Sequence, residues 1–165
     1  MSLLSVKKWV ALIVGTVLVF SLAACCVIQS TEPNITDDSS AAEKVAEGEL
    51  HFKIGNTEVS VDWENNNSVN ALVKLVGLEP LVIGMSMYGG FEQVGSLGTS
   101  LPRDDKQITT KAGDIVLYSG NQIVLFYGPN SWSYTRLGRI TDKTASEIAE
   151  LLGNGNVNIT ISSSL

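Results

Sequence analysis

Cysteine and histidine are nearly missing from this sequence, and their scarcity excludes several kinds of site. Both cysteines, Cys25 and Cys26, lie side by side near the N-terminus. The rest of the chain therefore holds neither a disulfide nor a thiol nucleophile. His51 is the single histidine, which excludes a histidine-rich zinc or iron site and any Ser-His-Asp triad not built on that residue. We expect no metal and no cofactor.

Basic side chains are also scarce. The 165 residues contain 11 Lys plus Arg against 17 Asp plus Glu. If Lys7 and Lys8 leave with an N-terminal leader, 9 basic side chains remain against 17 acidic ones, a net charge of −8. Such a balance argues against nucleic acid and against anionic membrane surfaces as partners.

The first 24 residues have the pattern of a signal peptide. Lys7 and Lys8 precede an uncharged run from Trp9 to Ile28, and a positive start followed by an apolar segment is typical of export. Within the run, Leu22-Ala23-Ala24-Cys25 resembles a bacterial lipobox, so we expect a lipid on Cys25. A run of about 20 residues can alternatively span a bilayer uncleaved. Both alternatives hold the protein at the cell membrane, facing outside the cytoplasm.

Two further regions follow the leader. Residues 25–48 are expected to form the lipidated cysteine and a flexible tether, because their Ser, Thr, Asp, Asn, Glu and Ala residues bury too little apolar surface to stay ordered. Residues 49–165 are expected to form one domain, since roughly 115 residues suffice for a hydrophobic core.

From Leu50 onward, alternating apolar and polar residues indicate β-strands. Helices are expected over about 69–76 and after the capping box Thr144-Ala-Ser-Glu147. The expected strands are a hairpin over 50–54 and 57–63, then 81–88, 107–110, 115–118, 122–127, 134–140 and 157–161, with 91–105 as a loop. About eight short strands need closure to hide their edges. The fold class is therefore mainly β: a closed eight-stranded barrel with two short capping α-helices.

Several motifs in this region resemble the prokaryotic cyclophilin-like domain family. They are Tyr88-Gly-Gly-Phe-Glu92, Gly95-Ser-Leu-Gly98, Leu101-Pro102, Gly113-Asp-Ile-Val-Leu-Tyr118, Gly120-Asn-Gln-Ile-Val-Leu-Phe-Tyr-Gly128 and Trp132-Ser-Tyr-Thr-Arg-Leu-Gly138. The resemblance covers about residues 49–162, and residues 113–138 are its most specific part. It implies the family's fold, an eight-stranded barrel capped by two helices.

The resemblance implies the fold more firmly than an activity. Cyclophilins proper isomerise X-Pro bonds with an arginine from a Phe-His-Arg motif, and the region from Met85 to Phe91 has no arginine. The run Gly120-Asn-Gln-Ile123 is similar to their Gly-Ser-Gln-Phe element, which implies that Gln122 orders a bound ligand. Arg136 is the weak catalytic candidate that remains, because it alternates with Tyr134. Arg139, at an odd offset, is expected to face the other way.

Aromatic and methionine side chains near the strand ends are the candidate pocket lining. The predicted ligand-binding residues are Met87, Tyr88, Phe91, Gln122, Phe126 and Tyr134; packing in the core is the alternative role for each. Trp132 and Tyr134 are expected in a loop leading into a strand. Asp114 is expected to fix its own turn, and His51 is expected to face solvent.

Three functions remain open. The favoured one is an anchored domain that binds a small molecule or an extended peptide without efficient catalysis. The second is a divergent peptidyl-prolyl cis-trans isomerase that assists the folding of exported proteins, and the third is a structural or partner-binding lipoprotein. Arg136 in one cleft with Gln122 and an apolar cup would favour the isomerase, whereas a cleft of Met, Phe and Tyr would favour binding.

Overall fold

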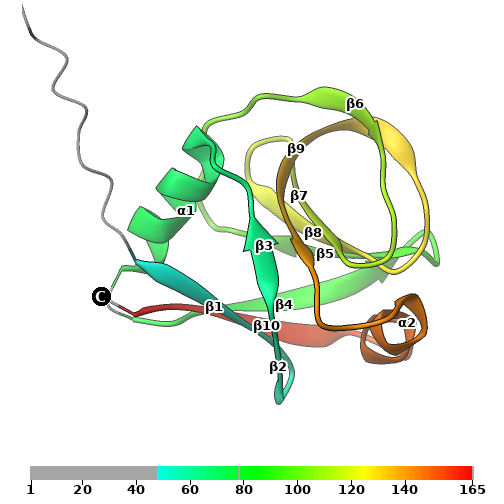
Figure 1. Ribbon diagram of the computed structural model, residues 1–165. Helices are drawn as coiled ribbons and strands as arrows, with labels where there is room; N and C mark the ends of the chain where they lie inside the picture. The colour runs from blue at the N-terminus through cyan, green and yellow to red at the C-terminus, as the bar shows by residue number, and fades with distance from the viewer. Residues whose placement is uncertain (1–47, 78, 165) are drawn as a thin grey trace, which may run out of the picture. The chain divides into compact units, whose positions relative to one another are not determined.

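The computed structural model describes residues 48–77 and 79–164, which form a nearly closed antiparallel β-barrel with two short helices (Figure 1). The expected leader, lipidated Cys25 and most of the tether lie outside the described residues. The predicted mainly β class is confirmed. The elements are β1 Glu49–Ile54, β2 Thr57–Val59, β3 Val61–Trp63, α1 Asn67–Val76, β4 Leu81–Tyr88, β5 Glu92–Ser96, β6 Lys106–Thr109, β7 Asp114–Tyr118, β8 Gln122–Phe126, β9 Ser131–Ile140, α2 Ala145–Leu152 and β10 Val157–Ser164.

The barrel is closed by one continuous segment that changes its partner. The strand order is β2-β1-β10-β4-β5-β8-β7-β9-β3, with β6 paired to β9 outside this path. Strand β2 pairs with β1, whereas β3 pairs with β9. The two ends of the path are thus joined through Ser60, the single residue between β2 and β3. The segment 57–63, expected to be one hairpin arm, therefore counts as two strands.

Parts of two predicted loops are strands. Residues 91–105 were expected to form a loop, but β5 lies between β4 and β8 in the sheet. Gly95 suggested a loop, yet in β5 it allows close packing, because a side chain there would collide with Met85 and Ile83. Similarly, β9 begins at Ser131, so Trp132 and Tyr134 are strand residues that pair with β6.

The turns and caps follow the sequence closely. The β7–β8 hairpin turns through Ser119 and Gly120, whose φ angles of 51° and 80° are typical of a type I′ turn. Asn66 caps α1 by accepting a hydrogen bond from the Val69 amide. The predicted capping box of α2 is present, with Thr144 and Glu147 bonded reciprocally.

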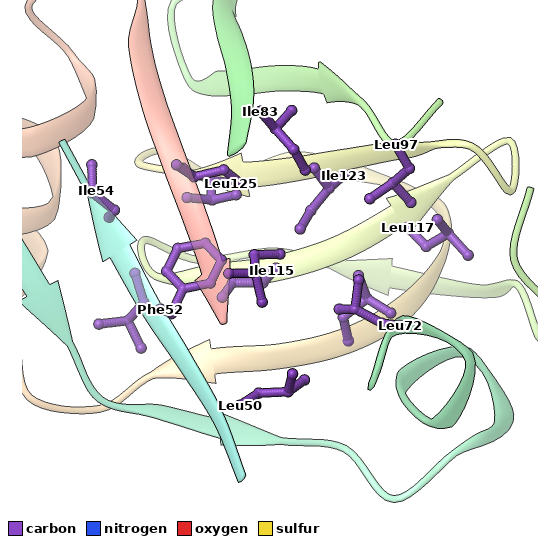
Figure 2. Close-up of a cluster of buried hydrophobic side chains, with 14 of the residues drawn as sticks. Leu50, Phe52, Ile54, Leu72, Ile83, Leu97, Ile115, Leu117, Ile123 and Leu125 are labelled. Atoms are coloured by element: carbon purple, nitrogen blue, oxygen red, sulfur yellow. The ribbon is translucent and has the colours of Figure 1, made fainter. Parts of the chain in front are cut away.

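The main core fills the barrel interior. Figure 2 shows Phe52 of β1, Ile115 of β7 and Leu125 of β8 converging there, with Leu72 of α1 beside them. Ile148 and Leu152 of α2 are buried in the same cluster. Both helices therefore bury their apolar faces against the barrel, as capping helices were expected to do. Within the described residues, neither helix is long and apolar enough to cross a membrane.

A second, smaller core lies on the outer face of the barrel. Residues Ile115 and Leu117 of β7 point into the main core, so Val116 between them points outward. Val116, Val124, Phe126 and Tyr134 form this outer cluster, with Phe91, Val94 and Ile108 packed against it. Strands β7, β8 and β9 are consequently covered on both faces, and the outer cluster is the floor on which the candidate site is built.

Candidate functional site

A pocket of about 440 Å³ lies over the outer cluster. Its lining comes from the end of β4, the β4–β5 turn, and strands β5, β7, β8 and β9, and comprises Tyr88, Phe91, Glu92, Val94, Tyr118, Gln122, Val124, Asn130, Trp132 and Tyr134. The volume lies within the range of about 300–1,000 Å³ that is usual for small-molecule sites. We call it the outer-face pocket.

Aromatic rings dominate the outer-face pocket. Tyr134 belongs to the buried floor, where its ring contacts Phe126 edge-on at 5.5 Å between centroids. Phe91 stacks on the same Phe126 at 6.4 Å and 3°. Tyr88 and Trp132, 68% and 57% exposed, lie at the opening. A rigid floor with exposed rings at the opening suits a ligand that offers a flat or apolar group.

Polar groups are few and fixed in position. The Asn130 amide Nδ2 donates to the Tyr134 hydroxyl at 2.8 Å, which holds both side chains in the lining. Burial raises the pKa of Tyr134, and the Glu92 carboxylate raises it further. Gln122 lies at the start of β8, opposite Tyr118 and Ser96 in the two neighbouring strands.

Glu92 is the one charged side chain among the described residues that line the pocket. It lies in β5 directly opposite Phe126 of β8 and is only 7% exposed. Its Oε2 atom is buried without a hydrogen-bond partner among the described residues. Burial raises the pKa of this carboxyl from 4.5 to about 7, because a low dielectric disfavours the charged form.

The structure brings four of the six predicted binding residues together. Tyr88, Phe91, Gln122 and Tyr134 line the outer-face pocket. Phe126 is fully buried beneath it and supports the rings above. Met87 is 39% exposed and is not part of the lining; its backbone amide donates to the Asn156 side chain.

Arg136, the weak catalytic candidate, lies outside the outer-face pocket. Its Nη1 is 2.8 Å from Asp114 Oδ1 and its Nε is 3.8 Å from Glu64. It lines a separate, polar cavity of about 360 Å³ together with Asp104 and Lys106. Arg136 and Gln122 therefore do not share a cleft.

Arg139 does not face away from Arg136 as expected, because the strand is irregular. Ile115 pairs with Gly138, whereas Val116 pairs with Arg136, so β9 carries one extra residue at this point. The bulge brings Arg136 and Arg139 to the same carboxylate: Arg139 Nε lies 2.8 Å from Asp114 Oδ1. Asp114 Oδ2 also accepts from the Lys111 amide, which confirms its predicted role in the turn.

Sequence reasoning missed Glu92 as a site residue, although a signal was available. Glu92 alternates with Val94, and an alternating pair in a strand faces one side. The assignment of residues 91–105 to a loop concealed this. Tyr118, Val94, Val124 and Asn130 were also not predicted, because their place in the lining depends on which strands become neighbours.

Comparisons with known proteins agree with the barrel. The model of the cyclophilin-like family matches residues 52–162. Among solved structures, the hypothetical protein AF2241 from Archaeoglobus fulgidus is similar with a TM-score of 0.52 and 16% sequence identity, over 74% of this chain and 99% of that one. At this identity the similarity supports the fold alone. No curated protein matches the chain.

Proposed function

The chain belongs to the cyclophilin-like family, and we propose that it binds a small organic molecule or an extended peptide in the outer-face pocket without efficient catalysis. The observation that carries this proposal is the pocket itself. Five of the side chains that line this pocket of about 440 Å³ are aromatic, and three of them, Tyr88, Tyr118 and Trp132, are exposed. Large exposed rings over a packed aromatic floor are typical of a recognition surface.

The three arginines of the described region, Arg103, Arg136 and Arg139, are paired with carboxylates, which bears on whether the protein catalyses prolyl isomerisation. Twisting an X-Pro bond crosses a barrier of about 18–20 kcal/mol, and an enzyme lowers it with donors that bind the twisted amide more tightly than the planar one. Arg136 and Arg139 instead donate to Asp114. Arg103 pairs with Asp105. These pairings support binding over prolyl isomerisation.

The test is a titration of the chain with a proline-containing peptide, measured by intrinsic tryptophan fluorescence, to which Trp132 of the pocket lining contributes. A protease-free isomerisation assay is run beside it. We expect saturable quenching, no acceleration, and weaker binding in Gln122→Ala. Gln107→Ala is the matched control, because Gln107 is an exposed residue of β6 outside the pocket lining. Robust catalysis that disappears in Arg136→Ala would establish the isomerase instead. If neither quenching nor catalysis is observed, the pocket is not a peptide site.

We propose further that a lipid on Cys25 holds this domain at the outer surface of the cell membrane. The support is the order of features in the sequence: Lys7 and Lys8, the apolar run, and Leu22-Ala23-Ala24-Cys25. A single domain on a polar tether would then sample the space next to the membrane without inserting into it.

A further inference from the structure

The outer-face pocket contains a buried carboxylate that nothing in the fold explains. The other buried carboxylate among the described residues, Asp114, accepts hydrogen bonds from two arginines and a backbone amide. Glu92 has no such partner for its Oε2. A buried polar atom without a partner is costly, and a cost of this kind persists where the group has a use.

We propose that the outer-face pocket selects ligands that carry a positively charged nitrogen, which Glu92 binds while the surrounding rings pack against it. This inference rests on the proposed function and names the ligand class for the same site. The ligand is a small organic ammonium compound or a peptide that offers its amine.

Three properties of the lining attract a cation. The carboxylate of Glu92 lies in a desolvated position, where an ion pair is screened less than at the surface. The aromatic side chains of Tyr118, Trp132 and Tyr134 also line the pocket, and aromatic rings attract cations through their faces. Lys, Arg and His are absent from the described residues that line the pocket, so no side chain there competes for the carboxylate.

The charge of the whole domain acts in the same direction. Residues 48–165 contain 8 Lys plus Arg against 12 Asp plus Glu, a net charge of −4. A net negative surface raises the local concentration of cations and speeds their arrival.

The ionisation of Glu92 makes cation binding dependent on pH. The titratable groups that face it are Tyr88 from β4, Tyr118 from β7 and Tyr134 from β9, while β8 contributes the uncharged Gln122. Burial raises the pKa of Tyr134 above its ordinary value of 10 and that of Glu92 to about 7. Glu92 is therefore the lining group that changes charge near neutrality, and a bound cation favours its deprotonation.

The experiment compares two probes of nearly equal shape, phenethylamine and 2-phenylethanol, which differ in charge. The full chain is placed in phospholipid nanodiscs, and binding is followed by intrinsic tryptophan fluorescence, to which Trp132 of the lining contributes, with empty nanodiscs as blank. We expect the amine to bind about tenfold more tightly than the alcohol at pH 8. Glu92→Gln is expected to remove this preference, so that the amine and the alcohol bind about equally. Glu150→Gln, which changes an exposed glutamate of α2, is the matched control.

A pH profile tests the same carboxylate without a substitution. In the wild-type chain the affinity for the amine should fall about tenfold from pH 8 to pH 6, and that for the alcohol should stay level. If the alcohol binds as tightly as the amine, or if Glu92→Gln leaves the preference intact, the cation inference is wrong and the pocket remains a neutral binding site. If neither probe binds the wild-type chain, both this inference and the proposed function are overturned.

Discussion

Two buried carboxylates of this barrel have opposite surroundings. Asp114 at the start of β7 is fully buried and receives hydrogen bonds from Arg136, Arg139 and the Lys111 amide. Glu92 at the start of β5 is buried in the lining of the aromatic outer-face pocket, and its Oε2 has no hydrogen-bond partner among the described residues. The first arrangement ties a turn to the bulge in β9. The second leaves a carboxyl group whose charged form is disfavoured by burial.

This difference predicts how stability depends on pH. The pKa of Glu92 is raised to about 7 in the folded protein, so between pH 4.5 and 7 the folded state holds a proton that the unfolded state has lost. The free energy of unfolding therefore falls as pH rises through this window. Glu92→Gln carries no charge at any pH, so we expect it to be more stable than the wild type by about 2 kcal/mol at pH 8.

The measurement is urea unfolding at pH 4.5, 6 and 8. The advantage of Glu92→Gln should shrink towards pH 4.5, where Glu92 of the wild type is protonated in the folded state and about half protonated in the unfolded state. Glu150→Gln provides the control, since Glu150 is exposed. If the stability difference between Glu92→Gln and the wild type is the same at all three pH values, burial does not raise the pKa of Glu92.

At the scale of single residues, the sequence predicted identities better than orientations. The aromatic residues flanking Gly89-Gly90 and the first residue of β8, Gln122, do line the pocket. The predicted orientation of Arg139 was wrong, because one extra residue in β9 changes which side chains share a face of the strand. The alternation of residues along the sequence does not reveal this bulge. The sequence therefore could not predict that Arg136 and Arg139 both donate to Asp114.

At the scale of elements, close backbone approach decides where glycine is required. Gly138 of β9 lies where the strand meets β3, and a Cβ there would be 2.7 Å from the Asp62 carbonyl oxygen and 3.0 Å from Val61. This contact is part of the segment that closes the barrel. The Asp62 carbonyl oxygen and Trp63 Cα, which is 3.3 Å from the added Cβ, belong to the β3 backbone, so there is little room to relax.

We therefore expect Gly138→Ala to lower the free energy of unfolding by about 2 kcal/mol, as overpacking does in a dense interior. The matched control is Gly84→Ala in β4, where the nearest atom, Asn158 Oδ1, is 3.7 Å from the added Cβ. That change should stay within about 0.5 kcal/mol. If the two variants are equally stable in urea unfolding, β3 moves to accommodate the added methyl group at no cost in stability, and the contact between Gly138 and β3 is not tightly packed.

Elements with strong local signals were predicted, and those defined by their neighbours were not. The span of β4, the β7–β8 hairpin and the capping box of α2 agree with the sequence, because alternation and capping residues act locally. β5 was missed because its glycine, needed for packing against Met85, is also a loop signal. The early start of β9 was missed because its first residues pair only with β6, a strand outside the barrel path.

At the scale of the whole molecule, the sequence predicted that the sheet closes into a barrel, but it did not predict where the outer-face pocket lies. Many short strands require hidden edges, and the barrel provides them through the switch at Ser60. The outer-face pocket draws side chains from five strands, several of them distant in sequence. Their convergence follows from strand order, which composition and periodicity do not encode.

The proposed anchoring also belongs to the scale of the whole molecule, and it rests on the sequence alone. The proposed leader ends in Leu22-Ala23-Ala24-Cys25, followed at once by Cys26. In the proposed lipobox, the small residues before Cys25 would let the peptide enter a lipoprotein signal peptidase, whereas Cys26 does not have Leu-Ala-Ala at the required offset. The two cysteines thus provide a matched pair of variants one residue apart.

We expect Cys25→Ala to abolish labelling of the chain by a radioactive fatty acid and to leave an uncleaved precursor, whereas Cys26→Ala should be labelled and processed like the wild type. A lipid-modified chain should also partition into the membrane fraction and resist extraction by high salt, because acyl chains bind through apolar burial and not through charge. Persistent labelling of Cys25→Ala would refute the lipobox assignment. Loss of labelling in both variants would indicate instead that the apolar run stays in the bilayer as an uncleaved anchor, which about 20 residues are long enough to provide.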